Sequence, residues 1–275
     1  MKHLKPAEIL DSMIEIMVTK SDGSFMKLFI LAILAGSFIA FGGECSNMAA
    51  FNLLAKPETY GLGRLLAGAI FSTGLMLVVL AGAELFTGNT MIIAAVCEKR
   101  TTMLKMLRNW GIVYIGNFVG SILIVYMMAN SGLFDLGASG LGAITLKTAV
   151  YKVNIPFHSA FFLGIMCNWL VCLAVWVAYG AESTIGKIFG IFFPICLFVT
   201  SGFEHSIANM YFIPAGLLIK SNSVYIDLSG VSAAALEHLT WGGFALNNLI
   251  PVTLGNIVGG CVFVAMAYWY AYKKA

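Results

Sequence analysis

The feature that most constrains the fold of this chain is an internal duplication. Residues 109–120 read NWGIVYIGNFVG and residues 248–259 read NLIPVTLGNIVG, with six identities in register at one offset (109 to 248). A second pair, ELFTGN at 84–89 and EHSIAN at 204–209, shares its first Glu and its last Asn. A third and looser match is between two sets of three residues: Phe29, Ala32 and Gly36, and Phe157, Ala160 and Gly164. The order is the same in both halves, which predicts two equivalent repeats.

The composition places these repeats in a membrane. Hydrophobic residues make up 60% of the chain and charged residues only 11%, with a mean hydropathy of +0.90, whereas a soluble domain carries about 25% charge. Apolar runs long enough to cross about 30 Å of hydrocarbon recur along the chain. We expect six spans, two of them interrupted: 27–50, 64–83 with a continuation at 90–97, 108–130, 156–180, 187–200 with a continuation at 207–220, and 243–271.

These spans predict an all-α integral membrane protein with six transmembrane helices, of which the second and the fifth are broken. We expect a cytoplasmic amphipathic helix within residues 1–24 and a transmembrane domain at 25–275. Within that domain, the first repeat covers about 25–130 and the second about 153–272. Duplicated halves of a membrane protein commonly build one pathway at their interface.

The distribution of Lys and Arg predicts the topology, because basic residues are enriched in cytoplasmic loops. Six crossings put both termini on one side. That side holds eleven of the basic residues: Lys2, Lys5, Lys20, Lys27, Lys99, Arg100, Lys105, Arg108, Lys187, Lys273 and Lys274. The other side holds five: Lys56, Arg64, Lys147, Lys152 and Lys220. We therefore expect cytoplasmic termini and two three-helix repeats of inverted orientation. The net charge of +3 reflects this bias and does not indicate nucleic-acid binding.

The segment before the first span is amphipathic. Residues 6–20 read PAEILDSMIEIMVTK, with Pro6 suited to a first helical turn. Apolar residues recur at helical spacing: Ile9, Leu10, Met13, Ile14 and Met17. Such a helix lies on the cytoplasmic surface. It either packs on the bundle or a neighbouring subunit, or it gates the cytoplasmic mouth.

The cysteines predict neither disulfides nor a metal site. Six are present, mostly within spans: Cys45, Cys97, Cys167, Cys172, Cys196 and Cys261. None belongs to a CxxC pair or a His-rich cluster, and buried cysteine commonly acts as a small apolar residue. We expect no cofactor.

Ionisable residues within spans are costly and are therefore candidates for function. The candidates are Glu44, Glu84, Glu204 and His205, with Lys152 and His158 at a span start. Two polar segments, 84–89 and 200–206, interrupt the second and fifth spans, and irregular backbone at this depth must be buried or line a cavity. Thr87 and Ser206 are placed to cap the half-helices that follow. Two half-helix N-termini facing one pathway favour an anion.

Several residues around these breaks have alternative roles. His205, next to Glu204, can meet an anion as a hydrogen-bond donor or hand it a proton. A carboxylate would repel an anion, so we expect Glu84 and Glu204 to accept hydrogen bonds from backbone N–H groups of the loops. Asn117 and Asn256 can join neighbouring helices or contact the substrate. Flanking apolar residues are core, lipid-facing or constrictions that exclude hydrated ions: Phe71, Leu75, Leu85, Phe86 and Phe198.

At these residues the chain resembles the formate/nitrite transporter family. The resemblance spans nearly the whole chain and rests on four segments: AELFTGN at 83–89, NWLVCLAVW at 168–176, SGFEHSIANMYFIPAG at 201–216 and NLIPVTLGNIVGG at 248–260. It implies an aquaporin-like protomer with its own pore, a homopentamer, and a bacterial-type inner membrane. Two segments differ from formate channels, FGGECSNMAAFN at 41–52 and AELFTGN itself. Formate, nitrite, hydrosulfide and lactate therefore stay open as the transported anion.

The resemblance also implies roles for individual residues. His205 is the central pore histidine and Thr87 is its partner. Asn168 and Asn256 lie around that centre, and Lys152 lies at the extracytoplasmic vestibule. The five flanking apolar residues are the constrictions, while Asn89 and Asn209, with Glu84, Glu204 and Asn117, structure the loops.

The expected function is a channel for a small monovalent weak-acid anion. Lys152 attracts the anion, and His205, helped by Thr87, protonates it or donates a hydrogen bond. A proton-coupled carrier of the same anions is the alternative. An aquaporin would need paired Asn-Pro-Ala motifs and an ammonium transporter paired pore histidines, and the sequence has neither. An enzyme would need a catalytic cluster that the spans lack, so we expect none.

Overall fold

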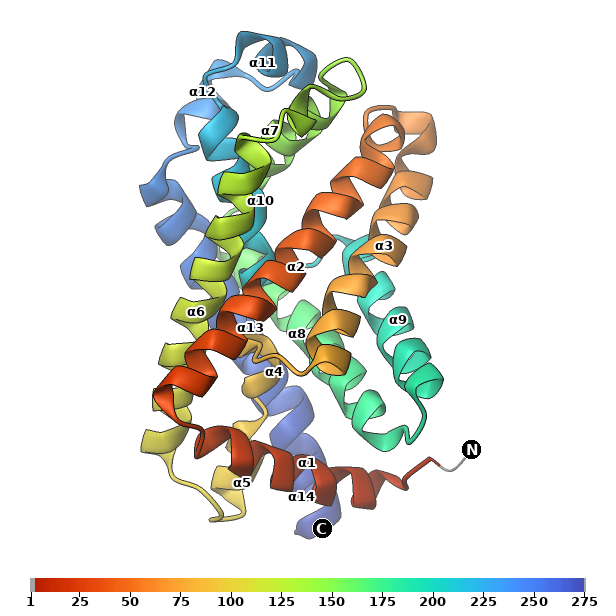
Figure 1. Cartoon of the computed structure of the whole chain (residues 1–275), viewed down its shortest axis with the longest axis vertical. Coiled ribbons are helices and arrows are strands. Elements are labelled where there is room, and N and C mark those ends of the chain that lie inside the picture. The colour runs from red at the N-terminus through yellow and green to blue at the C-terminus, as the bar shows by residue number, and fades with distance from the viewer. Residues whose placement is uncertain (1–2, 275) are drawn as a thin grey trace.

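The computed structural model of the protein describes residues 3–274, and these residues form a bundle of helices (Figure 1). The first half contains α1 (Pro6–Ser21), α2 (Phe25–Leu54), η1 (Pro57–Thr59), α3 (Tyr60–Ala81), α4 (Phe86–Asn89), α5 (Ile92–Cys97) and α6 (Met103–Ala129). The second half contains η2 (Leu133–Asp135), α7 (Gly140–Val153), α8 (Phe157–Gly180), α9 (Thr184–Ser201) and α10 (Ser206–Ile219). It ends with α11 (Ser223–Ser229), α12 (Ala233–Glu237), η3 (Gly243–Leu249), α13 (Ile250–Gly260), η4 (Cys261–Met266) and α14 (Ala267–Lys273).

Six helical segments of the described chain are long and apolar enough to cross a membrane, as predicted. They are α2, η1 with α3, α6, α8, α9, and the continuous segment from η3 to α14. Two shorter apolar segments, Phe86–Cys97 and Ser206–Ile219, complete the interrupted spans. The chain is therefore a multi-pass membrane protein.

The two ends of the bundle differ. α1 and α14 lie together at one end, here called the α1 end, and α7, α11 and α12 lie at the other, here called the α7 end (Figure 1). The short helices α1 and α7 each precede the first span of a half, and they lie at opposite ends. This placement follows from three crossings per repeat, which inverts one repeat relative to the other.

The helices of each repeat cross where glycines allow backbones to touch. In the first repeat α2 packs on α6, and a side chain at Gly120 would overlap the carbonyl oxygen of Ile33. In the second repeat α8 packs on α13, and a side chain at Gly259 would overlap the carbonyl oxygen of Ile165. Small residues at such crossings are typical of membrane helices.

These contacts correct the third sequence match. The carbonyl contacts pair Ile33 with Ile165, so the two first spans correspond at an offset of 132 residues (33 to 165). The match of Phe29, Ala32 and Gly36 to Phe157, Ala160 and Gly164 is wrong by four residues. The true counterparts are Phe161, Gly164 and Asn168. A shift of four residues is close to one helical turn, so the pattern of small and apolar residues fits both registers.

The amphipathic helix α1 packs on the bundle. Its five predicted apolar residues, Ile9, Leu10, Met13, Ile14 and Met17, are all at most 2% exposed. The helix α1 contacts α5, α6, α8 and α14 at the α1 end. α1 is thus an integral part of the protomer core, and its position before α2 matches that of α7 before α8.

Candidate functional site

Both predicted interruptions of the spans are present. α3 ends at Gly82 and α9 ends at Gly202, and both glycines adopt left-handed backbone (φ 81° and 82°) that stops the helix. An irregular segment follows each glycine, and α4 begins at Phe86 while α10 begins at Ser206. The two half-helix N-termini meet inside the bundle, where the Thr87 and His205 side chains touch.

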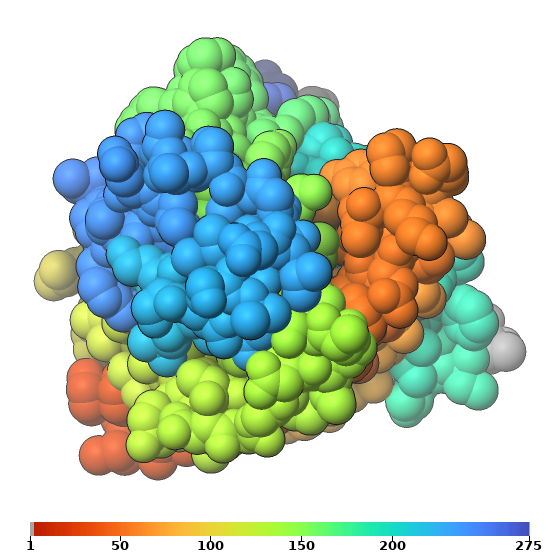
Figure 2. Space-filling view, turned by 90° about the horizontal axis from the view of Figure 1, so that it is seen from above, coloured from red at the N-terminus to blue at the C-terminus, as the bar shows by residue number. Residues whose placement is uncertain are grey.

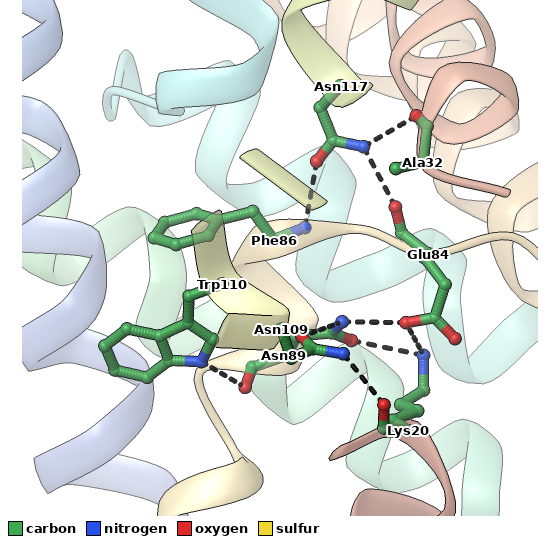
Figure 3. A network of polar contacts seen from close by, with 8 residues as sticks. All are labelled: Lys20, Ala32, Glu84, Phe86, Asn89, Asn109, Trp110 and Asn117. Atoms are coloured by element: carbon green, nitrogen blue, oxygen red, sulfur yellow. Dashed lines mark hydrogen bonds and ion pairs between the residues drawn. The ribbon is translucent and has the colours of Figure 1, made fainter. Parts of the chain in front are cut away.

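Two asparagines at equivalent positions hold the loops before these half-helices. Asn117 Oδ1 accepts from the Phe86 N–H (3.0 Å), and its amide donates to the carbonyls of Glu84 (2.9 Å) and Ala32 (2.8 Å) (Figure 3). Asn256 Oδ1 accepts from the Ser206 N–H (2.9 Å). Its amide donates to the carbonyls of Glu204 (3.0 Å) and Gly164 (2.8 Å). Both asparagines are fully buried, so each satisfies backbone groups that water cannot reach.

A charged cluster at the α1 end fixes the first loop. Lys20 from α1 contacts Glu84 Oε2 (2.9 Å) and Asn89 Oδ1 (3.1 Å). The Asn89 amide donates to Glu84 (2.7 Å) and to Asn109 Oδ1 (2.9 Å). The Asn109 amide donates to the carbonyl of Lys20 (2.9 Å), which closes a ring of hydrogen bonds (Figure 3). The loop is therefore tied to both α1 and α6.

The second repeat builds the same cluster at the α7 end. Lys152 from α7 pairs with Glu204 Oε1 (2.7 Å), and the Asn209 amide donates to Glu204 Oε2 (2.7 Å). The Asn209 amide also reaches Asn248 Oδ1 (2.7 Å), and the Asn248 amide donates to the carbonyl of Lys152 (2.9 Å). Lys152 also lies 5.4 Å from the centre of the Phe212 ring. Its charge is thus balanced inside the protein by a buried carboxylate.

The clusters correct two expectations. The carboxylates of Glu84 and Glu204 accept from lysine and asparagine side chains, and not from loop N–H groups. Neither Thr87 nor Ser206 caps a half-helix. Thr87 lies within α4, and the side chain that caps α10 is His205, one residue before Ser206. The sequence could not separate adjacent cap positions, because helix starts are uncertain by a residue or more.

The hydrogen bonds of His205 define its neutral form. Its Nδ1 accepts from the Ala208 N–H (3.1 Å), so this nitrogen carries no proton in that arrangement. The proton of the neutral ring then lies on Nε2, which donates to Thr87 Oγ1 at 2.9 Å. The Thr87 hydroxyl accepts this bond and keeps its own proton available. The pair can therefore present an O–H donor to an anion while both residues stay neutral.

Three further side chains hold the backbone carbonyl of Thr87 in place. Its carbonyl accepts from Thr90 Oγ1 (2.7 Å), Asn168 Nδ2 (3.2 Å) and Cys172 Sγ (3.4 Å). The Asn168 amide also donates to the carbonyl of Asn256 (2.7 Å), which joins the two loops. Asn168 thus positions the backbone of Thr87, and its amide nitrogen is used within the protein.

The predicted constriction residues have three kinds of surroundings. Phe71 and Phe198 meet edge to face (5.8 Å), and Phe198 lies 6.0 Å from the His205 ring. Phe86 packs instead against Trp110 (5.9 Å) and Tyr114 (4.8 Å) of α6. The remaining two, Leu75 and Leu85, are 2% and 3% exposed.

Three residues of the charged clusters were missed from the sequence. Lys20, Asn109 and Asn248 complete the rings described above, yet none was predicted to belong to the site. A signal was present for the asparagines, because they begin the duplicated segments 109–120 and 248–259. Lys20 precedes Lys152 by the same offset that relates the first spans (20 to 152). That offset became clear only once α2 and α8 were aligned in space.

Within residues 3–274 no group of three or more His, Cys, Asp or Glu side chains is arranged to hold a metal ion. The described site consists of hydroxyl, imidazole and amide groups, set among apolar rings and two lysine–carboxylate pairs.

Comparisons with known proteins find similar chains over almost the whole length of this one. The family model described as formate/nitrite transporter matches residues 7–270. A probable formate transporter of Methanothermobacter thermautotrophicus is 41% identical over 98% of this chain and 97% of its own length. The formate channel FocA of Escherichia coli K12 is 40% identical over 98% of this chain and 95% of its own length.

The fold is similar to solved structures of the same kind. A pentameric formate channel with formate bound superposes with a TM-score of 0.80, at 40% identity over 91% of this chain and 98% of that chain. An FNT family ion channel gives a TM-score of 0.79, at 29% identity over 96% of this chain and 98% of that one. With a family model over almost its entire length and relatives of matching sequence and fold, the chain belongs to the formate/nitrite transporter family.

Proposed function

We propose that this protein is a selective membrane channel for formate or a closely related monovalent weak-acid anion. The observation that carries the proposal is the Thr87–His205 pair, which lies where two half-helix N-termini meet under the rings of Phe71 and Phe198. Desolvating a small anion is costly, and helix N-termini and hydroxyl donors lower that cost. The relatives named as formate channels support formate as the first substrate to test.

The hydrogen bonds of His205 favour one of its two possible roles. Protonating Nδ1 would place two N–H donors, those of Nδ1 and Ala208, opposite each other. It would also place a positive charge at the N-terminus of α10. We therefore propose that the neutral ring holds the Thr87 hydroxyl, and that this hydroxyl donates to the anion. Any proton that accompanies the anion then comes from water in the vestibule, since the neutral ring gives none up.

We further propose that the α1 end faces the cytoplasm and that the protein is a homopentamer in a bacterial-type inner membrane. The excess of Lys and Arg on the side of the termini supports the orientation. The similarity to a pentameric channel supports the assembly. In this orientation Lys152 and its cluster lie on the extracytoplasmic side, and Asn168 and Asn256 hold the loops at the centre.

The test is uptake of labelled formate into liposomes that contain the purified protein, with nitrite, hydrosulfide and chloride as competitors. Thr87→Ser keeps the hydroxyl and Thr87→Val removes it at similar size, so this pair isolates the donor. We expect the Ser variant to retain flux and the Val variant to lose about tenfold, as for one hydrogen bond to a charged group. Equal flux in both variants would contradict the role of the hydroxyl.

The same preparation separates a channel from a proton-coupled carrier. A channel for the anion gives a current in a planar bilayer that follows the formate gradient at equal pH on both sides. A carrier that moves formate together with a proton gives uptake driven by a pH gradient and no such current. Absence of formate flux in intact oligomers would refute the proposed substrate, and direct uptake of nitrite or hydrosulfide by the same liposomes would name the alternative.

A further inference from the structure

Arg64 is a cation at the α7 end that has no carboxylate partner. It lies near the start of α3 and is partly buried. Its guanidinium donates to the carbonyls of Val199 and Thr200, the second of these at 3.4 Å. Among residues 3–274, none of the ion pairs includes Arg64. Its partners are thus neutral carbonyl groups, in contrast to Lys152, whose partner is a buried carboxylate.

Arg64 lies beside the loop that leads to His205. Its Nη2 is 3.6 Å from the position that a side chain at Gly202 would take, three residues before the histidine. The hydroxyl of Tyr151, next to Lys152 on α7, is affected by the same charges. Burial, the Glu204 carboxylate and Tyr60 raise the pKa of Tyr151, and Arg64 opposes this rise. Arg64, Tyr151 and the Lys152–Glu204 pair therefore lie near one another at the α7 end.

The shape of this end is consistent with an entrance there. Seen from above, the corner formed by the end of α2, η1 and the start of α3 stands apart from α11 and α12, with a depression between them (Figure 2). Arg64 belongs to the start of α3 in this corner. It precedes Phe71 by seven residues, about two helical turns, so it lies nearer the α7 end than the Phe71–Phe198 rings.

The charges of Arg64 and Lys152 can each be summed with those of the groups they contact. The C-terminus of α9, which Arg64 contacts, carries about half a negative charge, so a full guanidinium charge leaves about half a positive charge. Lys152 with Glu204 sums to zero. Lys56 and Lys147 are exposed to solvent, as are the carboxylates of Glu58 and Glu237, and Lys220 donates to the carbonyl of Leu239. Arg64 is therefore a fixed, partly buried cation whose charge exceeds that of the groups it contacts.

We propose that Arg64 recruits the anion at the α7-end mouth and thereby sets the concentration at which the channel half-saturates. The inference rests on the proposed function and adds a residue to it. Lys152 holds the loop of Glu204 in place, and Arg64 supplies the attractive charge. A single charge near a low-dielectric mouth raises the local anion concentration by about threefold to tenfold at low ionic strength.

The test compares Arg64→Gln with Arg64→Lys. Gln keeps donors for the carbonyls of Val199 and Thr200 but removes the charge, and Lys keeps the charge. Lys56→Gln is the matched control, because it removes an exposed cation from the same end. Formate influx is measured against concentration in membrane vesicles of both orientations, at low ionic strength and in high potassium gluconate.

We expect Arg64→Gln to raise the half-saturating formate concentration by about threefold to tenfold, for influx from the α7 end only. The difference should vanish in high gluconate, where the screening length falls to about 3 Å, and Arg64→Lys should behave as the original protein. Lys56→Gln should change little.

Two outcomes would overturn the inference. If Arg64→Gln lowers the maximal flux or the thermal stability of the oligomer with an unchanged half-saturating concentration, Arg64 only caps α9. If Arg64→Lys and Arg64→Gln behave alike, the charge is irrelevant. Both outcomes leave formate flux in the original protein intact, so they are distinct from failure of the proposed function, in which the original protein conducts no formate.

Discussion

At the scale of single residues, the site depends on charges that are buried together. Lys152 and Glu204 have side chains that are 11% and 3% exposed, and their nitrogen–oxygen distance is 2.7 Å. Removing one member of such a pair leaves a buried charge alone, which costs about 3–5 kcal/mol. Replacing both by apolar residues of similar size is often close to neutral. The pair therefore matters less for net stability than for keeping each partner compensated.

This reasoning predicts a strong non-additivity. Glu204→Gln alone and Lys152→Met alone should each lower the stability of the folded protein by about 3 kcal/mol. The double variant should lose clearly less stability than the sum of the two single losses. The measurement is thermal unfolding of the purified oligomer in a double-mutant cycle, and the equivalent cycle at Lys20 and Glu84 provides the comparison. Additive losses would contradict the assignment of Lys152 as a charge balanced by Glu204.

At the scale of helices, close backbone contact defines the bundle. α2 and α6 touch where Gly120 faces the Ile33 carbonyl, and α8 and α13 touch at the equivalent Gly259. Gly111 lies in the same helix as Gly120, is exposed, and has nothing within 4 Å of the position of a side chain. An alanine at Gly111 therefore tests helix propensity alone, whereas an alanine at Gly120 also tests the contact between α2 and α6.

Accordingly, Gly120→Ala should destabilise the protein by about 1–3 kcal/mol, because the added methyl group forces α2 away from α6. Gly111→Ala should be neutral or stabilise it by about 0.5–1 kcal/mol, since alanine favours helix. Both are measured as shifts in the unfolding temperature of the oligomer. Equal effects at the two positions would mean that the contact between α2 and α6 is looser than described.

The helix α1 is held by its apolar face and, at its surface, by ion pairs. Glu15 pairs with Arg100 (3.0 Å for Nη2), and this contact holds the pKa of Glu15 below its ordinary value of 4.5. A lowered carboxyl pKa adds stability that is present above the unfolded value and is lost as the pH falls through the folded value. Because both side chains are exposed, the contribution is small and is screened by salt.

We therefore expect Leu10→Asp to release α1 from the bundle, since Leu10 is fully buried, while Glu15→Gln leaves α1 docked. Limited proteolysis within residues 3–24 reports the release. Acidification below the ordinary pKa of Glu15 should increase cleavage slightly in the original protein and have less effect in Glu15→Gln. Rapid cleavage of Glu15→Gln at neutral pH would show that the ion pair, and not the apolar face, holds α1.

At the scale of the whole molecule, the repeats invert and bring two equivalent charged clusters to opposite ends. Lys20 lies near the α1 end and Lys152 near the α7 end, and each ties a short helix to the loop of a broken span. The outer surface is apolar, and α9 in particular leaves Phe189 and Phe193 exposed at 58% and 63%. Such a surface requires lipid or other subunits around it.

The orientation gives a prediction for the entire protein. In a variant that lacks the six native cysteines, Glu58→Cys probes the α7 end and Glu182→Cys probes the α1 end, and both positions are exposed. A membrane-impermeant maleimide added to intact cells should label Glu58→Cys and leave Glu182→Cys unlabelled until the membrane is opened. The reverse pattern would place the termini outside and overturn the topology drawn from Lys and Arg.

The sequence by itself determined the membrane class, the number of spans, the two breaks and the equivalence of the Asn117 and Asn256 segments. Hydrocarbon thickness sets the length of each apolar run. The breaks are visible in the sequence because a polar motif interrupts such a run in both halves. Only the tertiary structure decided the register of α2 against α8, the partners of Glu84 and Glu204, and the cap formed by His205. The register and the lysine partners depend on side chains that meet across helices far apart in sequence, 52 residues for Lys152 and Glu204, and no local pattern records that distance. The His205 cap differs from the predicted Ser206 cap by one residue, which is within the uncertainty of a helix start.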